Sequence, residues 1–90
     1  MLNDRINNCR ICGFGLKDPP WGTNGKDPTW EICPCCGVEF GYEDVTSESA
    51  RLFRNAWIAN GAKWFDAGEK PDGWALDTQL LERPDGFRGS

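Results

Sequence analysis

The sequence of 90 residues contains no histidine, and this absence removes several kinds of chemistry. Imidazole is a common general base near neutral pH and a common metal ligand. Without it, Ser-His-Asp and Cys-His catalysis by this chain alone is excluded. Any metal site in this protein must therefore be built without imidazole ligands.

Long apolar runs are also missing. No apolar run approaches the roughly 18 residues that cross a bilayer, and the first eight residues, MLNDRINN, are polar and do not resemble a secretory signal. We therefore expect a cytoplasmic protein with no membrane association. Cytoplasmic cysteines stay reduced, and the odd number of five cysteines also argues against a disulfide framework.

The chain has no cluster of basic residues. It carries 10 basic and 14 acidic side chains, and residues 1–45 carry 4 basic and 7 acidic ones. Nucleic-acid binding normally needs a positive surface that contacts phosphates, so no nucleic-acid partner is expected. The five Trp, five Phe and one Tyr are accordingly expected in the core rather than as platforms for stacking bases.

The length fits one small domain whose core alone would be marginally stable. We divide residues 1–90 into a cysteine-rich ribbon (5–45), a helical extension packed on it (46–83) and a frayed tail (84–90). Period-two alternation in Thr29–Ile32 and Val38–Tyr42 predicts two short strands that form a hairpin. The predicted fold class is α+β, with a small β-ribbon followed by one main helix and a short C-terminal helix.

The main helix is predicted over residues 46–60, with Thr46 as its N-cap, Glu48 in its first turn and Gly61 as its C-terminal glycine. Helical spacing predicts a buried face and an opposite polar face. The expected buried face holds Ala50, Leu52, Phe53, Ala56 and Trp57. The expected polar face holds Arg51, Arg54 and Asn55. A last short helix is predicted around residues 77–82, with Asp77 as its cap.

The cysteines form two C-x2-C-G units, CRICG and CPCCG, with 20 residues between Cys12 and Cys33. Two residues between cysteines let both sulfurs face one ion, and Gly13 and Gly37 permit the positive φ of such a turn. This spacing is typical of a four-cysteine metal site. Tetrahedral thiolate sites accept zinc and iron, and the pattern does not choose between them. The predicted metal ligands are Cys9, Cys12, Cys33 and Cys36.

The fifth cysteine, Cys35, lies inside the second unit at the position that Ile11 occupies in the first. Its side chain is therefore expected to point away from the metal. It can be a small buried filler, or a spare thiol for redox sensing or metal exchange.

These motifs resemble the rubredoxin-like and zinc-ribbon group, and more specifically a set of small, uncharacterised bacterial cysteine-rich proteins of the CPCC type. The resemblance rests on CRICG, EICPCCGVEFGYED, WIANGAKWFD, Gly73-Trp74 and the later Gln79-Leu80, and it spans residues 9–81. It implies a four-cysteine metal site in a rubredoxin-like or zinc-ribbon fold. Some such proteins lie near bacterial toxin systems, which suggests an immunity or partner-binding role.

The resulting hypothesis is a non-enzymatic protein with one structural zinc ion that interacts with a protein partner. The alternative is a rubredoxin-like electron-transfer protein with a four-cysteine iron site, whose acidic surface would suit a basic redox partner. The sequence indicates neither the partner nor the oligomeric state. Catalysis is not expected, because the available acids give no clear pair of facing carboxylates. The candidate acids are Glu39, Glu43, Asp44 and Asp66.

Overall fold

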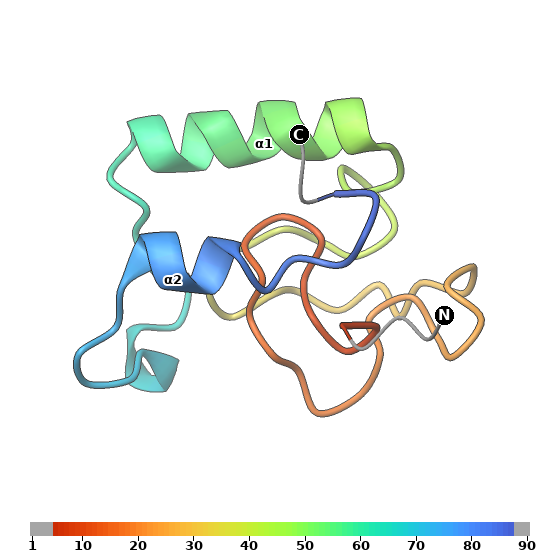
Figure 1. The fold of residues 1–90 in the computed structure, drawn as a ribbon, viewed down its shortest axis with the longest axis horizontal. Coiled ribbons are helices and arrows are strands. Elements are labelled where there is room, and N and C mark those ends of the chain that lie inside the picture. Colours follow the sequence, from red (N-terminus) through yellow and green to blue (C-terminus); the bar gives the residue numbers. More distant parts are fainter. Residues whose placement is uncertain (1–4, 88–90) are drawn as a thin grey trace.

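The computed structural model describes residues 5–87. Its helical segments all follow a long irregular N-terminal half (Figure 1). Helix α1 spans Ser47–Ala59, the 3-10 helix η1 spans Ala67–Glu69, and helix α2 spans Leu76–Leu80. Within residues 5–46, β-type pairing is limited to two isolated antiparallel bridges. These bridges join Asn8 to Gly15 and Ile32 to Glu39.

The predicted α+β class is wrong, because the described part of the chain has helices and no β-sheet. The hairpin predicted around CPCCG is reduced to the single bridge between Ile32 and Glu39. On the incoming side, Trp30 has a φ of 64°, which is a left-handed conformation and interrupts the extended chain. A strand cannot extend back from the bridge through such a residue.

The outgoing side of the predicted hairpin also turns away at once. Gly41 has a φ of 106°, and the amide of Tyr42 donates to the carbonyl of Glu39 at 3.1 Å, as in a turn. The alternation that suggested a strand reflects burial instead, since Val38 and Phe40 are buried while Glu39 between them is exposed. An alternating pattern this short marks one buried side of a loop as readily as a strand.

Helix α1 agrees with the prediction. The Thr46 side chain accepts a hydrogen bond from the Ser49 amide, and the Ser49 side chain accepts one from the Thr46 amide, so the N-terminus has a reciprocal capping box. Glu48 lies in the first turn. Gly61 follows the C-cap with a φ of 99°, and its amide donates to the Ile58 carbonyl at 2.9 Å.

The predicted orientation of α1 is partly wrong. Its buried residues are Ala50, Arg54 and Trp57, whereas the side chain of Leu52 is 58% exposed. Arg54 was expected on the polar face, yet it is 3% exposed. A charged side chain is buried only where the interior offers it partners, and these partners are carbonyls of the first cysteine unit.

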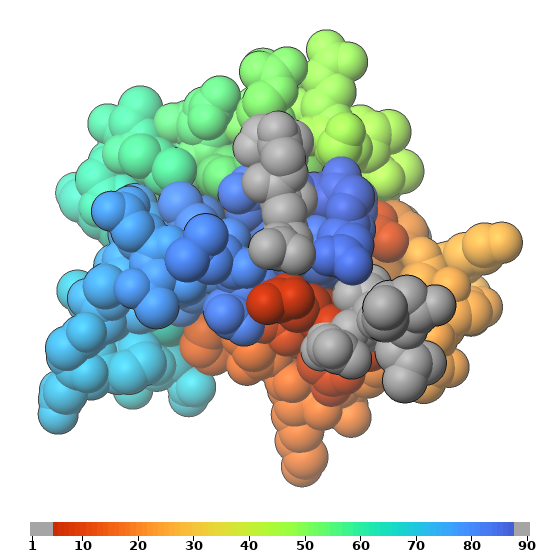
Figure 2. All heavy atoms as spheres, in the orientation of Figure 1, coloured from red at the N-terminus to blue at the C-terminus, as the bar shows by residue number. Residues whose placement is uncertain are grey.

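The second helix, predicted around 77–82, is α2 at Leu76–Leu80. Its N-cap is Ala75, which makes no side-chain capping bond, so the assignment of Asp77 as cap is wrong and Asp77 lies in the first turn. Figure 2 shows α2 and the segment after it, in blue, filling the space between α1, in green, and the N-terminal loops. No helix among residues 5–87 is long and apolar enough to cross a membrane.

The core is centred on the cysteines and not on the helices. All five cysteines are buried with Ile11, Val38 and Phe40, and α1 adds Ala50 and Trp57. Three further rings pack edge to face at its border, with Trp64 between Phe14 and Trp74 at centroid distances of 5.4 Å. Residues 84–87 of the predicted tail include buried Pro84 and half-buried Phe87, and residues 88–90 lie outside the described part.

Candidate metal centre

The two cysteine units fold into loops with the same backbone pattern, which we call the first cysteine loop (residues 8–15) and the second cysteine loop (residues 32–39). In each, the amide of the first cysteine donates across the loop, from Cys9 to the Phe14 carbonyl and from Cys33 to the Val38 carbonyl, both at 2.9 Å. Each loop also closes with one isolated bridge. Every matching position is 24 residues apart in the sequence, so one backbone arrangement occurs twice.

The glycine of each unit fulfils the predicted role. Gly13 has a φ of 85° and Gly37 a φ of 83°. Their amides donate back to the carbonyls of Cys9 and Cys33, at 2.9 and 3.0 Å. A residue with a Cβ would be strained at this φ, so the turn that brings the paired cysteines together depends on glycine.

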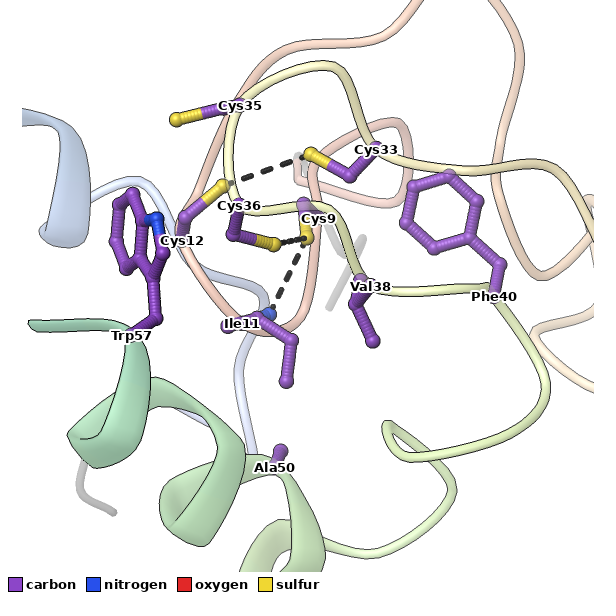
Figure 3. Close-up of a cluster of buried hydrophobic side chains, with 10 residues drawn as sticks. All are labelled: Cys9, Ile11, Cys12, Cys33, Cys35, Cys36, Val38, Phe40, Ala50 and Trp57. Carbon is purple, nitrogen blue, oxygen red and sulfur yellow. Dashed lines mark hydrogen bonds between the residues drawn. The ribbon is translucent and has the colours of Figure 1, made fainter. Parts of the chain in front are cut away.

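The two loops face each other and bring four sulfur atoms together, as Figure 3 shows. Cys9 Sγ lies 3.7 Å from Cys36 Sγ, and Cys12 Sγ lies 3.7 Å from Cys33 Sγ. All four sulfurs lie within 4.8 Å of one another, and all four residues are buried. We call this group the four-cysteine cluster. It matches the set predicted as metal ligands, and such an arrangement can hold a metal ion.

The spacing of the sulfurs suits a tetrahedral ion. Metal–sulfur bonds of about 2.3 Å in a tetrahedron place the sulfurs about 3.8 Å apart, close to the two 3.7 Å separations. The five cysteines form no disulfide in this arrangement. The chemistry of the donor set therefore fits one thiophilic cation bound by four thiolates, and zinc and iron both meet that description.

Burial and mutual hydrogen bonding govern ionisation within the cluster. Burial raises the pKa of the Cys12 and Cys36 thiols well above the usual value. Hydrogen bonds from the other thiols, from Cys12 first, lower the pKa of Cys33. The amide of Ile11 donates to Cys9 Sγ at 3.4 Å. Four thiolates in so dry a site need a cation to offset their charge, which is what a divalent metal supplies.

Arg54 of α1 reaches the first cysteine loop from the helical half. Its Nε donates to the Ile11 carbonyl, and its Nη2 donates to the Arg10 carbonyl at 3.1 Å. Burial lowers the pKa of Arg54 to about 10, so the guanidinium remains charged at neutral pH. The sequence analysis missed this residue, although its spacing from Ala50 and Trp57 places it on their helix face.

Two backbone amides hold the second cysteine loop at the matching positions. The Phe65 amide donates to the Cys35 carbonyl at 2.9 Å, and the Asp66 amide donates to the Pro34 carbonyl at 2.8 Å. Pro34 and Cys35 correspond to Arg10 and Ile11 of the first loop. The central carbonyls of both loops are thus satisfied, by a side chain in one case and by the main chain in the other.

Cys35 is buried but lies outside the four-cysteine cluster. Figure 3 shows its side chain on the outer side of the second loop, as predicted from its alignment with Ile11. Gln79 of α2 donates from Nε2 to Cys35 Sγ and to the Cys12 carbonyl, both at 3.2 Å. Trp74 Nε1 donates to Gln79 Oε1 at 2.8 Å. Gln79 therefore links the two loops, a role that the sequence pattern did not reveal.

The four candidate acids do not gather into a second site. Asp44 is buried and accepts from Trp21 Nε1 and the Gly41 amide, each at 2.8 Å, which is a structural role. Asp66 accepts from the Gly68 amide and caps η1. Glu39 and Glu43 are exposed. Among the described residues, the four-cysteine cluster is the one group of three or more potential metal ligands that lie close enough together to hold an ion.

Comparison with known proteins gives two matches from Bacillus subtilis (strain 168). The uncharacterized protein YozI is 32% identical over 84 residues, which cover 76% of this chain and 69% of YozI. The uncharacterized protein YoaQ is 33% identical over 73 residues, which cover 64% of this chain and 62% of YoaQ. No family model and no solved structure matches the chain.

The extent of the first match establishes common descent, and the four close cysteines fit a small cysteine-rich family. Neither relative carries an assigned activity, so the matches bring no substrate or reaction with them. The chain belongs to the same family as YozI of Bacillus subtilis.

Proposed function

We propose that this chain is a non-enzymatic protein in which the four-cysteine cluster binds one zinc ion that stabilises the fold. The observation that carries the proposal is the buried group of four sulfurs with 3.7 Å separations between the two loops. A site with four protein ligands leaves no position open for substrate or water, so the metal stabilises and does not catalyse. The ligands would be Cys9, Cys12, Cys33 and Cys36.

The need for a metal follows from the architecture of the core. Residues 5–46 contain no helix and only two isolated bridges, and the core is centred on the cysteines. Binding to a four-thiolate site contributes roughly 10–16 kcal/mol of folding free energy in zinc-finger peptides. A contribution of that size would hold together loops that few backbone hydrogen bonds connect. Thiolate ligands must stay reduced, which supports a reducing compartment such as the cytoplasm.

The test is elemental analysis with a visible spectrum, on protein isolated from its native host at native expression level. We expect one zinc ion per chain and a colourless protein. One iron per chain, with thiolate-to-metal bands that bleach on reduction with dithionite, would replace the structural role by electron transfer. Absence of a stoichiometric metal would overturn the proposal.

A chelation experiment adds an independent measure. Unfolding should track metal loss when a strong chelator is titrated, because the site and the fold form together. Circular dichroism follows α1, and the released zinc can be counted with a colorimetric indicator. Retention of helical structure after complete metal removal would contradict a stabilising role.

A further inference from the structure

Large apolar side chains are exposed next to the second cysteine loop. The side chains of Trp30, Ile32 and Tyr42 are 58%, 47% and 69% exposed. Residues 27–50 contain six acidic residues and no basic residue. Of these acids, Glu31 and Glu39 are exposed among the apolar side chains. We call these five residues the acidic-apolar surface. Such exposed aromatic and aliphatic groups between charges are typical of a protein contact.

The members of this surface are neighbours in space. Ile32 pairs with Glu39 across the isolated bridge, and the Phe40 amide donates to the Glu31 carbonyl at 2.9 Å. The ring of Trp30 lies against Gly41, where an added Cβ would meet the ring at 2.8 Å. Tyr42 follows Gly41 directly. The five residues therefore lie on chain segments that contact one another.

A groove adjoins the surface and gives it depth. It has a volume of about 310 Å³ and shares Glu31 and Ile32 with the surface. The groove runs between the second cysteine loop and the segment after the first. Its apolar lining comes from Leu16, Pro20, Ile32, Pro34 and Phe40, and its charged lining comes from one basic residue, Lys17, and two acids, Asp18 and Glu31. A groove of this kind can accept one large apolar side chain while the acids remain at its rim.

The backbone of Trp30 adopts a strained, left-handed conformation. Its φ of 64° is unfavourable for any residue with a Cβ, by about 1–2 kcal/mol relative to right-handed conformations. Glycine would adopt this φ freely. Keeping a large ring here, mostly exposed, is difficult to explain by stability alone. Strained residues of this kind often serve binding.

We propose that the acidic-apolar surface binds a basic segment of a protein partner, one in which Lys or Arg residues flank a large apolar side chain. The negative charge of the surface favours a positively charged partner. Nucleic acids and anionic lipids would be repelled, and a second copy of this chain would bring the same acids face to face. The inference rests on the proposed function, since a four-thiolate zinc site adds two negative charges close to this surface.

Photo-crosslinking in cells of the native host tests the partner's chemistry. p-Benzoylphenylalanine replaces Tyr42 in one strain and Leu81, which is similarly exposed near α2, in a control strain. We expect a crosslink from position 42 alone, to a peptide of another protein with Lys or Arg within a few residues of a large apolar side chain. A crosslink to this chain itself, to nucleic acid or to an acidic segment would overturn the proposal. The same holds for no crosslink, or for equal crosslinks from both positions.

The crosslinked segment is then synthesised and titrated into the zinc-loaded chain by calorimetry. Trp30→Gly should weaken binding by about 30-fold or more, as expected of a central aromatic anchor. Glu31→Lys with Glu39→Lys should weaken it by roughly tenfold and reduce its salt dependence. The control pair Glu48→Lys with Asp72→Lys, two exposed acids outside the surface, should change binding by less than about twofold.

Metal content and thermal unfolding of each variant separate this inference from the proposed function. Trp30→Gly exchanges partial burial of the ring for relief of the backbone strain, so the unfolding midpoint should move by only a few degrees. Every variant should keep one zinc per chain. Unchanged affinity in zinc-loaded Trp30→Gly would sink the docking surface and leave the metal site standing, whereas loss of zinc from the wild-type chain would sink both.

Discussion

The first and second cysteine loops present the same two central carbonyls to the rest of the molecule but satisfy them in different ways. In the first loop, the Arg54 side chain donates to the carbonyls of Arg10 and Ile11. In the second, the amides of Phe65 and Asp66 donate to the carbonyls at the matching positions. The two loops therefore share one backbone arrangement but receive their hydrogen bonds from different kinds of donor. The first loop depends on the side chain of Arg54, while the second depends on where the main chain places the amides of residues 65 and 66.

This difference determines which substitutions each loop can tolerate. A backbone amide is present at almost every residue, so these two hydrogen bonds do not require particular side chains at positions 65 and 66, both of which are exposed. A buried guanidinium that reaches two carbonyls has no substitute among the other side chains. Sensitivity to mutation should therefore be concentrated on Arg54 in the first loop and spread over the main chain in the second.

The largest effect should come from removing a sulfur, and it should be the same in both loops. Cys12→Ser and Cys36→Ser occupy matching positions, and each should unfold the domain or lower its stability by more than about 3 kcal/mol, because a four-thiolate site loses most of its affinity. Cys35→Ser should cost less than about 1 kcal/mol, since a hydroxyl can still accept from Gln79. Thermal unfolding with zinc analysis measures all three. Equal midpoints for Cys35→Ser and Cys36→Ser would remove Cys36 from the ligand set.

Arg54→Met should destabilise the domain by about 3 kcal/mol, since one buried and one partly buried carbonyl lose their donors. Phe65→Ala should cost less than about 1 kcal/mol, because its ring is largely exposed and its amide is retained. Urea unfolding of zinc-loaded protein gives both values. Arg51→Met, an exposed position on the same helix, is the matched control and should stay within about 0.5 kcal/mol. Equal losses for Arg51→Met and Arg54→Met would disprove the special role of Arg54.

The two loop glycines should differ although their φ values agree. Ala at either position bears a strain of about 1–2 kcal/mol at positive φ. A Cβ at Gly13 would also overlap the Gln79 carbonyl oxygen, whereas the atoms nearest to one at Gly37 belong to the Phe65 side chain, at 3.4 Å or more. We therefore expect Gly13→Ala to lower the free energy of unfolding by about 2 kcal/mol more than Gly37→Ala does, as measured by urea unfolding. Equal costs would mean that α2 does not press on the first loop.

The smallest effect concerns the residue that spans both loops. Trp74→Phe removes the donor that orients Gln79, and it should cost about 1 kcal/mol. Trp64→Phe is the matched control, because the buried Nε1 of Trp64 has no hydrogen-bond partner among the described residues. Removing this unpaired N–H group in Trp64→Phe should leave the stability unchanged or raise it slightly. Thermal unfolding midpoints rank the two variants, and the reverse order would show that Gln79 is positioned by other contacts.

The features predicted correctly from the sequence are those fixed by interactions between residues close together in the chain. The four-cysteine cluster follows from spacing and glycine within each C-x2-C-G unit, and the ends of α1 follow from Thr46 and Gly61. The hairpin failed because a left-handed Trp30 has no local signature in the sequence. Arg54 and Gln79 were missed because their partners lie 43 and 67 residues away. Pairings over such distances depend on tertiary packing, which periodicity does not report.

The hydrogen bonds from Arg54 of α1 to the first cysteine loop can form only late in synthesis of the chain. All four sulfurs precede Arg54 and residues 65–66 in the sequence, so the complete ligand set emerges before the groups that secure the loops. Synthesis proceeds at roughly 5–20 residues per second, which leaves an interval of a few seconds at most. During that interval a nascent chain can capture an ion with loops whose central carbonyls still face water. Docking of α1 would then secure the first loop only after all four sulfurs are available.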